Sequence, residues 1–348
     1  MAHKNTQDLL KLLGVQIPII QAPMAGADSV ELVINVARAG GLGSLACAML
    51  TTDQVIAQYH SIKAKTNQPI NLNFFCHQQV EKSSIQQQKW LNRLLPYYTA
   101  YHLDPATVAP AVARLPFNEE YCRVVEQIRP AIVSFHFGLP DQQLLQRVKA
   151  TGAIVLSSAT TVEEGIWLEK AGCDVVIAQG QEAGGHRALF LTDELSTQLP
   201  TAQLVQLLAK ELTVPIVAAG GIADAQAIKE AFTWGAAAVQ LGTAYLFCAE
   251  ARVAPLHRQV LATDSATAIT NIFSGRPARG ITNRLIQEIG PICSDAPDFP
   301  YATDAVMPLR KASEALGSID CMQLWSGQVR KPHAMDAYDF TLYLNSQL

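Results

Sequence analysis

The segment 178–187, AQGQEAGGHR, combines residue types that bind flat ligands and move protons. It follows an apolar, β-branched run and contains three glycines, one carboxylate, one imidazole and two carboxamides. Glycine lets a backbone approach a ligand closely because no Cβ intervenes, and His186 can exchange a proton near neutral pH. Glu182 can orient a backbone amide or His186, or pair with Arg187. We predict a ligand-binding loop with His186 as its reactive group; a tight surface turn is the alternative.

A second imidazole ends another strand-like run, in the segment 134–138, SFHFG. A single histidine between aromatic residues is often a structural residue of the core. His136 becomes a catalytic candidate because it would end its strand at the same rim as His186. We therefore predict His136 and His186 as the catalytic residues. The other histidines are weaker catalytic candidates: His3, His60, His77, His102, His257 and His333. Among them, His77 is the most plausible.

Two glycine-containing turns can bind an anion. The segments 215–224, PIVAAGGIAD, and 238–243, AVQLGT, each place glycine at the end of a strand-like run and before a helix. Amides at the N-terminus of a helix stabilise an anion, and glycine lets its oxygens approach. In eight-stranded barrels, the loops after strands seven and eight commonly bind phosphate. These turns predict a phosphate-bearing cofactor near Gly220, Gly221 and Gly242.

Two further strand ends carry residue types that suit a ring-shaped ligand. Pro23 and Met24, within QAPMAG at 21–26, offer an apolar, polarisable floor for an aromatic ring system. Asn71 and Asn73 are two residues apart in a strand-like run and therefore lie on one face. Buried amides need hydrogen-bonding partners, and either a cofactor edge or a network with neighbouring strands can provide them.

Strand-like and helical segments alternate in eight units, with capping residues such as Asp53, Asp141, Thr161 and Asp224. Continuous apolar strands separated by helices indicate a parallel sheet covered by helices, and the count of eight predicts a (β/α)8 TIM barrel. An open doubly wound sheet is the alternative, but the glycines at 41–46 lack the context of a dinucleotide fingerprint. The expected strands are 18–24, 42–46, 70–75, 131–137, 153–157, 175–178, 215–219 and 238–241, and the expected helices are 31–39, 52–64, 119–128, 141–150, 162–171, 202–211 and 225–234.

Two long segments interrupt the alternation. Residues 76–118 are rich in Gln, Tyr and Pro and contain a helical piece at 84–95, and residues 251–300 follow the eighth strand. Both are expected at the C-terminal rim of the barrel, where loops build active sites. We predict a barrel over 1–250 with the rim insertion 76–118, a small, mostly helical substrate-covering subdomain over 251–300, and helices over 301–348 that pack back on the barrel.

Composition narrows the class of protein. The 348 residues are 49% hydrophobic and 16% charged, as in a globular chain with a large core. The net charge of -4 gives no basis for a nucleic-acid or membrane partner, and no run of about 18 apolar residues would span a bilayer. The N-terminal segment does not resemble a signal peptide. Seven scattered cysteines without metal-ligand spacing predict reduced thiols, no metal site and a cytoplasmic location. We expect a monomer or a homodimer.

Several segments, in chain order, resemble the nitronate monooxygenases, formerly called 2-nitropropane dioxygenases. These segments are QAPMAG (21–26), AGGLGSL (39–45), NLNFF (71–75), SFHFG (134–138), GQEAGGHR (180–187), AAGGIAD (218–224) and QLGTA (240–244). A later run, with Pro300-Tyr301, Leu309-Arg310 and LWSGQ at 324–328, resembles the C-terminal signature of class I members. The resemblance covers nearly the whole chain.

The resemblance implies an FMN-binding TIM barrel with a smaller second domain over the flavin. His186 matches the active-site histidine, His136 matches the second histidine of class I members, and Tyr301 is expected to help close the substrate pocket. Ala188 stands where the family usually has glycine, which predicts a slightly re-aimed loop. The implied residues for the phosphate, the ribityl chain and the ring are Ala22, Pro23, Met24, Asn73, Gln179, Gly184, Gly185, Gly220, Gly221, Gln240, Leu241, Gly242 and Thr243.

The implied reaction is the oxidation of a nitronate, with propionate 3-nitronate the usual substrate of class I. The nitronate carbon becomes a carbonyl, nitrite is released and O2 is consumed, with one-electron transfer to the flavin. Protonated or hydrogen-bonding His186 and His136 would stabilise the nitro oxygens, and His186 is the natural base if a neutral nitroalkane is used. Two alternatives are an NAD(P)H-dependent FMN reductase of quinones or enoyl thioesters and a non-catalytic flavin-binding protein.

Overall fold

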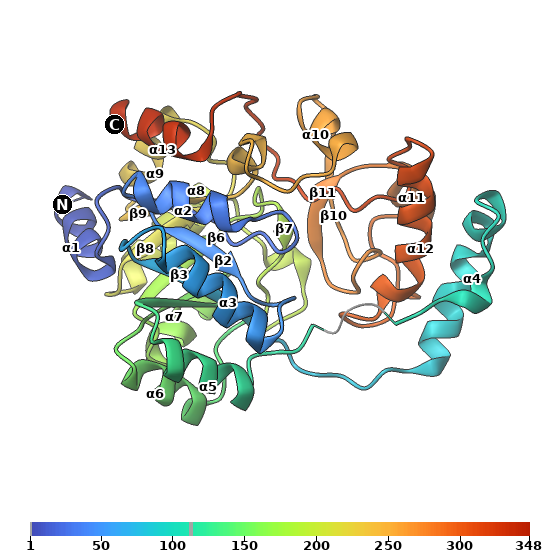
Figure 1. Ribbon diagram of the computed structural model, residues 1–348, viewed down its shortest axis with the longest axis horizontal. Coiled ribbons are helices and arrows are strands. Elements are labelled where there is room, and N and C mark those ends of the chain that lie inside the picture. Colours follow the sequence, from blue (N-terminus) through green and yellow to red (C-terminus); the bar gives the residue numbers. More distant parts are fainter. Residues whose placement is uncertain (1, 111–113) are drawn as a thin grey trace.

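The computed structural model describes residues 2–110 and 114–348. Eight parallel strands form a barrel with helices on its outside (Figure 1), which confirms the predicted (β/α)8 architecture. The strands follow one another in chain order, and a parallel bridge between Ile20 and Leu42 joins the first strand to the second. The barrel strands are β1 (Ile19–Gln21), β2 (Gly43–Ala46), β3 (Ile70–Phe75), β4 (Ile132–His136), β5 (Ile154–Ala159), β6 (Val175–Gln179), β8 (Ile216–Ala219) and β9 (Ala238–Leu241).

The helices around the barrel begin at capping residues. The side chains of Asp141, Thr161 and Asp224 accept first-turn amides, as predicted. Thr51 rather than Asp53 caps the helix after β2, because its hydroxyl accepts a first-turn amide within a capping box. The outer helices are α2 (Val30–Arg38), α3 (Thr52–Lys63), α5 (Glu119–Ile128), α6 (Gln142–Ala150), α7 (Val162–Lys170), α8 (Thr201–Glu211) and α9 (Ala225–Thr233), and the short 3-10 helices are η1 (Pro105–Thr107), η2 (Leu195–Thr197) and η3 (Thr243–Phe247).

The helix α1 (Ala2–Leu13) closes the N-terminal end of the barrel. Leu9 and Leu13 pack with apolar residues that point into the barrel, among them Ile132, Val175 and Val217. A separate and larger core lies between the strands and the outer helices. Because the N-terminal end is filled by apolar side chains, the polar residues of the strands are left for the C-terminal end.

A second, smaller domain lies beside the C-terminal ends of the strands (Figure 1). It contains α10 (Pro255–Leu261), an antiparallel hairpin of β10 (Thr267–Thr270) and β11 (Ala278–Ile281), α11 (Arg284–Ile289) and α12 (Ala302–Ala315). The expected mostly helical subdomain therefore also holds two strands, which the small residues of this region did not reveal.

The helix α4 (Ser84–Ala100) comes from the insertion after β3 and packs against α12. Trp90 Nε1 donates to Ala302 O, and Tyr98 OH donates to Ala305 O. In contrast, α13 (Ala337–Ser346) lies against α2 on the barrel. This grouping differs from the expected division at residues 250 and 300, because periodicity reveals the apolar face of a helix but not its partner.

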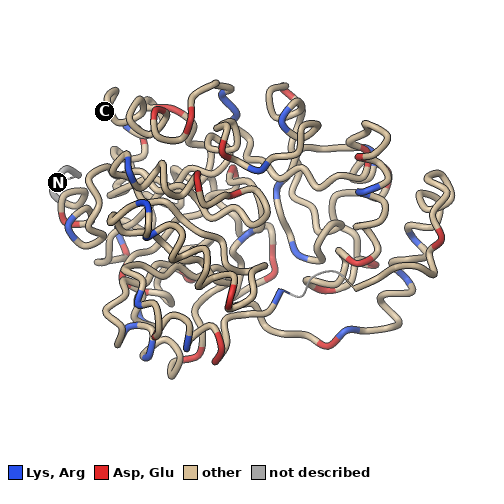
Figure 2. Tube along the Cα trace, in the orientation of Figure 1, with Lys and Arg blue, Asp and Glu red and all other residues tan. Residues whose placement is uncertain are grey.

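Both domains mix charges of the two signs. Figure 2 shows basic and acidic residues interspersed along the barrel and the second domain. Within residues 2–110 and 114–348, no helix is long and apolar enough to cross a membrane. All seven cysteines are free thiols, as their spacing predicted.

Candidate active site

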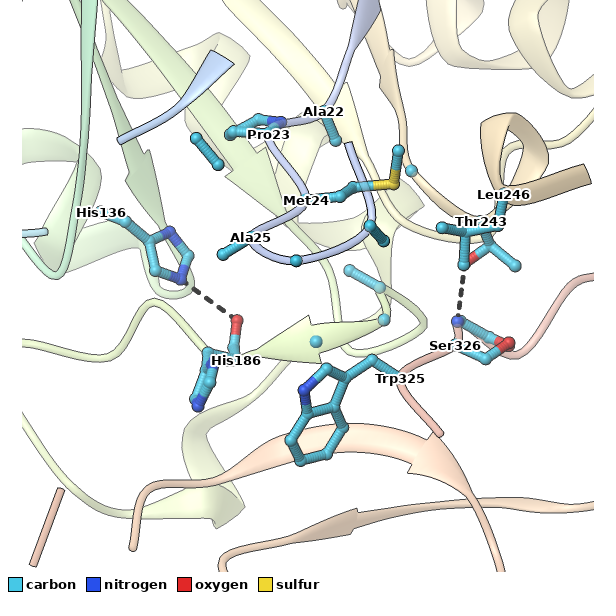
Figure 3. A pocket seen from close by; sticks show the side chains of 18 of the residues that line it. Ala22, Pro23, Met24, Ala25, His136, His186, Thr243, Leu246, Trp325 and Ser326 are labelled. Carbon is cyan, nitrogen blue, oxygen red and sulfur yellow. Dashed lines mark hydrogen bonds between the residues drawn. The ribbon is translucent and has the colours of Figure 1, made fainter. Parts of the chain in front are cut away.

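A cavity of about 330 Å³ lies at the C-terminal ends of the barrel strands, beside the second domain. The loop 22–25 after β1 forms one wall (Figure 3). His136 and His186 lie on one side, Thr243 lies on the opposite side, and Trp325 of the second domain faces the loop. This position and size are typical of the ligand site of a TIM barrel.

Nearly all of the predicted site residues line this cavity: Ala22, Pro23, Met24, Asn73, His136, Gln179, Gly184, Gly185, His186, Gly220, Gly221, Gln240, Gly242 and Thr243. Leu241 does not, because it alternates with Gln240 on β9 and packs in the outer core. Tyr301 does not line the cavity either. Its hydroxyl donates to Val80 O at 3.0 Å, so this residue ties the insertion 76–118 to α12 instead of closing the pocket.

Side-chain hydrogen bonds close the loop between β6 and residue 188. Gln179 Nε2 donates to His186 O at 3.0 Å, and Gln179 Oε1 accepts from Ala188 N at 2.9 Å. The fully buried guanidinium of Arg187 donates to the carbonyls of Gln179 and Gly180, each at 2.8 Å. Burial, together with the charge of a neighbouring arginine, lowers the pKa of Arg187 to about 9. The segment is therefore a braced wall of the cavity and not a surface turn.

Two further side chains clarify the sequence expectations for this loop. Glu182 Oε2 accepts from Thr201 N at 2.9 Å and from Thr201 Oγ1 at 2.6 Å. The carboxylate thus orients a backbone amide at the start of α8, one of the roles considered for it. Ala188 is buried and does not have a left-handed φ. Alanine therefore fits this position without backbone strain.

The two candidate catalytic histidines meet through the short strand β7 (Gly185–His186). His136 Nε2 lies 3.2 Å from His186 O. Burial lowers the pKa of His136 to about 3. Burial and then the charge of Arg114 hold the pKa of His186 well below its ordinary value. Both imidazoles are therefore neutral near pH 7, so they can accept a proton but bring no positive charge.

The positive charge of the cavity comes from arginines to which the sequence analysis gave no role. Arg114, Arg252 and Arg310 line the cavity, whereas Glu182 is the one carboxylate residue among its described lining residues. A cavity with this balance favours an anionic ligand. No motif or periodicity marks Arg114 and Arg252, because each comes from an irregular connection, and Arg310 stood in the sequence analysis only as part of the C-terminal signature.

Arg114 is the arginine whose contacts place it near the histidines. Its guanidinium carbon lies 5.6 Å from the ring centre of Phe299, and its Nη1 lies 3.4 Å from Thr303 Oγ1. The Phe299 ring is in turn 5.4 Å from the imidazole of His186. Phe299 is therefore a neighbour of both this cation and the candidate base.

Asparagine side chains of β3 form part of a network with β4. Nδ2 of Asn71 and Nδ2 of Asn73 lie 2.8 and 2.9 Å from Ser134 Oγ. This is the cross-strand network that the sequence analysis held as an alternative to a cofactor contact. Asn73 also lines the cavity, so the network orients its amide there.

Several polar groups at the far side of the cavity are left for a ligand. Gln240 Oε1 is buried without a hydrogen-bond partner, and within the described chain the amides of Gly221 and Gly242 donate to no other residue. Gly220 and Gly221 have φ values of +119° and +71°, which favour glycine. The helix expected after β9 is the short η3. Free amides beside an unsatisfied carboxamide oxygen fit a ligand with a phosphate and polar ring atoms.

The fold and the cavity define a class of protein, a (β/α)8 barrel with an arginine-lined rim cavity and two neutral histidines beside a second domain. The chain belongs to the nitronate monooxygenase family, whose model matches residues 6–336. Members of this family depend on a flavin.

Individual relatives agree with this membership. A nitronate monooxygenase from Pseudomonas aeruginosa is 38% identical and aligns over 93% of each chain. One from Paraburkholderia phytofirmans is also 38% identical, over 92% of this chain and 88% of the relative. The solved structure of a nitroalkane oxidase from Streptomyces ansochromogenes has a TM-score of 0.88 and 32% identity, with 97% of each chain covered.

Proposed function

We propose that this protein is an FMN-dependent enzyme that oxidises alkyl nitronates with O2 to a carbonyl compound and nitrite. The observation that supports this proposal most strongly is the composition of the cavity. Unpaired polar groups, two neutral imidazoles and the partly buried Arg114 line one cavity. The proposal also draws on family membership across residues 6–336.

The residues present fit FMN. The free amides of Gly221 and Gly242 would hold the phosphate. Gln240 Oε1, which has no protein partner, would meet a polar group of the cofactor, and the apolar loop 22–24 would lie against the ring face. Bound FMN would supply the one-electron redox chemistry of nitronate oxidation.

The protein's own residues would bind and orient the substrate. A nitronate carries its negative charge on the nitro oxygens, and the partly buried guanidinium of Arg114 would stabilise that charge. The rings of Phe299 and Trp325, 5.4 and 5.6 Å from the His186 imidazole, would exclude water from the reacting carbon. Neutral His186 would take up a proton when a nitroalkane is the substrate.

An oxygen-electrode assay of the FMN-loaded protein with propionate 3-nitronate tests the proposal. We expect nitronate-dependent O2 uptake with release of nitrite, and no anaerobic bleaching of the flavin by NADH. Bleaching by NADH without nitronate-dependent O2 uptake would instead indicate an NAD(P)H-dependent reductase. A flavin-containing protein that is inert in both assays would be a binding protein.

A further inference from the structure

Ser274 lies in the turn between β10 and β11 and contacts the imidazole of His186. Its Oγ is 2.9 Å from His186 Nε2 and 3.2 Å from Arg276 O. The serine is 1% exposed, so bulk water does not compete for these contacts. The hydroxyl is thus held between an imidazole nitrogen and a backbone carbonyl.

These two contacts together favour a proton on Nε2 of His186. A carbonyl oxygen can only accept, so the one hydroxyl proton of Ser274 goes to Arg276 O. The Ser274 oxygen must then accept from His186, and Nε2 is the donor. Because a neutral imidazole has one N–H, Nδ1 is left with a lone pair.

The hairpin that carries Ser274 also holds the backbone of the histidine. Ala278 of β11 pairs with His186 of β7, and Arg187 N donates to Pro277 O at 2.8 Å. The second domain therefore holds both the main chain and the ring of His186, although the histidine follows a barrel strand. A base whose far nitrogen is oriented by a third group is a recurring arrangement in enzymes.

We propose that Ser274 is a positioning residue that keeps His186 in the Nε2–H tautomer and so makes Nδ1 the atom that accepts a proton from a neutral nitroalkane. The C–H bond next to the nitro group breaks, its electron pair stays on the substrate as the nitronate, and an N–H bond forms at Nδ1. No electrons are exchanged in this step. The proposal rests on the proposed function and states which atom of His186 would act on a neutral nitroalkane.

His136 follows the same pattern. Its Nε2 faces the carbonyl oxygen of His186 and must donate to it, which leaves the lone pair of its own Nδ1 unused by this contact. Each of these neutral rings therefore donates its one N–H to another group of the protein, either His186 O or Ser274 Oγ. This arrangement suits proton acceptance better than hydrogen bonding to nitro oxygens, the other role expected from the sequence.

The test combines 15N NMR of the FMN-loaded, histidine-labelled protein with turnover of a nitroalkane and of its nitronate. The His186 signals are assigned by their loss in His186→Asn. In the wild type we expect a protonated Nε2 and a non-protonated Nδ1. In Ser274→Ala we expect a mixture of tautomers and a fall of about tenfold in the ratio of nitroalkane to nitronate turnover. Ser274→Thr, which keeps the hydroxyl, should restore both readouts.

Thr270→Val is the matched control, because Thr270 is a buried residue of the same hairpin whose hydroxyl accepts from Ile272 N and not from a histidine. It should leave the tautomer and the turnover ratio as in the wild type. A wild-type His186 that is protonated at Nδ1 would overturn the proposal without any variant, as would Ser274→Ala with unchanged signals and an unchanged ratio. A wild type that oxidises nitronates but not nitroalkanes would refute the proton-accepting role and leave the proposed function standing. Absence of nitronate oxidation would refute the proposed function itself.

Discussion

Different residues of the candidate site bring the positive charge and the basic nitrogens. Arg114 can stay charged in a partly buried position because its intrinsic pKa is high, whereas burial makes His136 and His186 neutral. The neutral imidazoles can accept a proton, and the neighbouring guanidinium can stabilise the anion that results. Two predictions at the scale of single residues follow from this division.

His186→Asn is expected to keep FMN bound while turnover of a nitroalkane falls by about 10²–10⁴, the usual contribution of a general base. Asparagine has an amide but no basic nitrogen. Steady-state kinetics at a flavin content verified by absorbance would measure the effect. Wild-type turnover at full flavin content would contradict the role of His186.

Arg114→Gln is expected to raise KM for a nitronate by roughly tenfold to a hundredfold, because a hydrogen bond to a charged group contributes about 1.5–3 kcal/mol. Lys82→Gln provides a control, since Lys82 pairs with Asp304 but does not line the cavity. Steady-state measurement of KM for both variants would separate a local contact from a general loss of charge. Equal KM values for the two variants would argue against a role for Arg114 in binding.

At the scale of elements, the cavity wall depends on a close approach between the loop after β6 and the segment 326–327. A Cβ on Gly184 would lie 2.4 Å from Gly327 N and 2.5 Å from Ser326 C. Gly327 N also donates to Thr243 Oγ1 at 2.8 Å. The loops after β6 and β9 and the segment from the second domain are therefore packed as one wall.

Gly184→Ala is expected to lower the free energy of unfolding by about 1–3 kcal/mol, because the added methyl group meets backbone atoms that cannot rotate away. Urea unfolding of the FMN-free protein would measure the change. If the urea midpoint of the variant equals that of the wild type, the segment 326–327 moves aside at little cost in free energy.

Gly242→Ala is expected to change the free energy of unfolding by less than about 0.5 kcal/mol, and to weaken FMN binding about tenfold. A Cβ there would make an ordinary contact of 3.5 Å with Ala22 Cβ, and the φ of -107° suits alanine. The methyl group would nevertheless occupy space beside an amide proposed to hold the phosphate. Fluorescence titration with FMN would test this prediction. If the variant binds FMN as tightly as the wild type does, the phosphate lies elsewhere.

The elements also show how far sequence patterns reach. Seven of the eight strands were predicted to within two residues at each end, because continuous apolar runs bounded by glycine and capping residues are local signals. The hairpin of β10 and β11 was missed, since its strands are four residues each and form only by pairing with each other and with β7. Tyr301 was misplaced because its hydroxyl partner, Val80, is 221 residues away.

At the scale of the whole molecule, buried neutral histidines link stability to pH. Burial is the main cause that lowers the pKa of His77 to about 4, of His257 to about 4 and of His136 to about 3. An unfolded histidine titrates near 6.5. Between these values the unfolded chain binds more protons than the folded one, so the free energy of unfolding falls as the pH falls.

We therefore expect the protein to become less stable as the pH is lowered from about 6.5 to about 4, by up to about 1.4 kcal/mol per pH unit for each histidine. Asp28 opposes this trend, because burial raises its pKa to about 7, but one carboxyl group does not outweigh three imidazoles. Urea unfolding at several pH values would measure the slope. His77→Gln should reduce the slope, whereas replacement of the exposed His60 should not. A flat or opposite slope in the wild type would contradict this origin.

The sequence by itself determined the eight-unit alternation, the identity of the two histidines and the glycine turns around the cavity. Each of these features depends on residue types that lie a few positions apart in the sequence. Only the tertiary structure decided that these histidines are neutral, that Arg114 supplies charge and that Ser274 holds His186. Burial, charge proximity and hydrogen bonding depend on which atoms meet in space, and the contact between His186 and Ser274 spans 88 residues. Local sequence patterns do not predict such a contact, because it forms only when the second domain packs against the barrel.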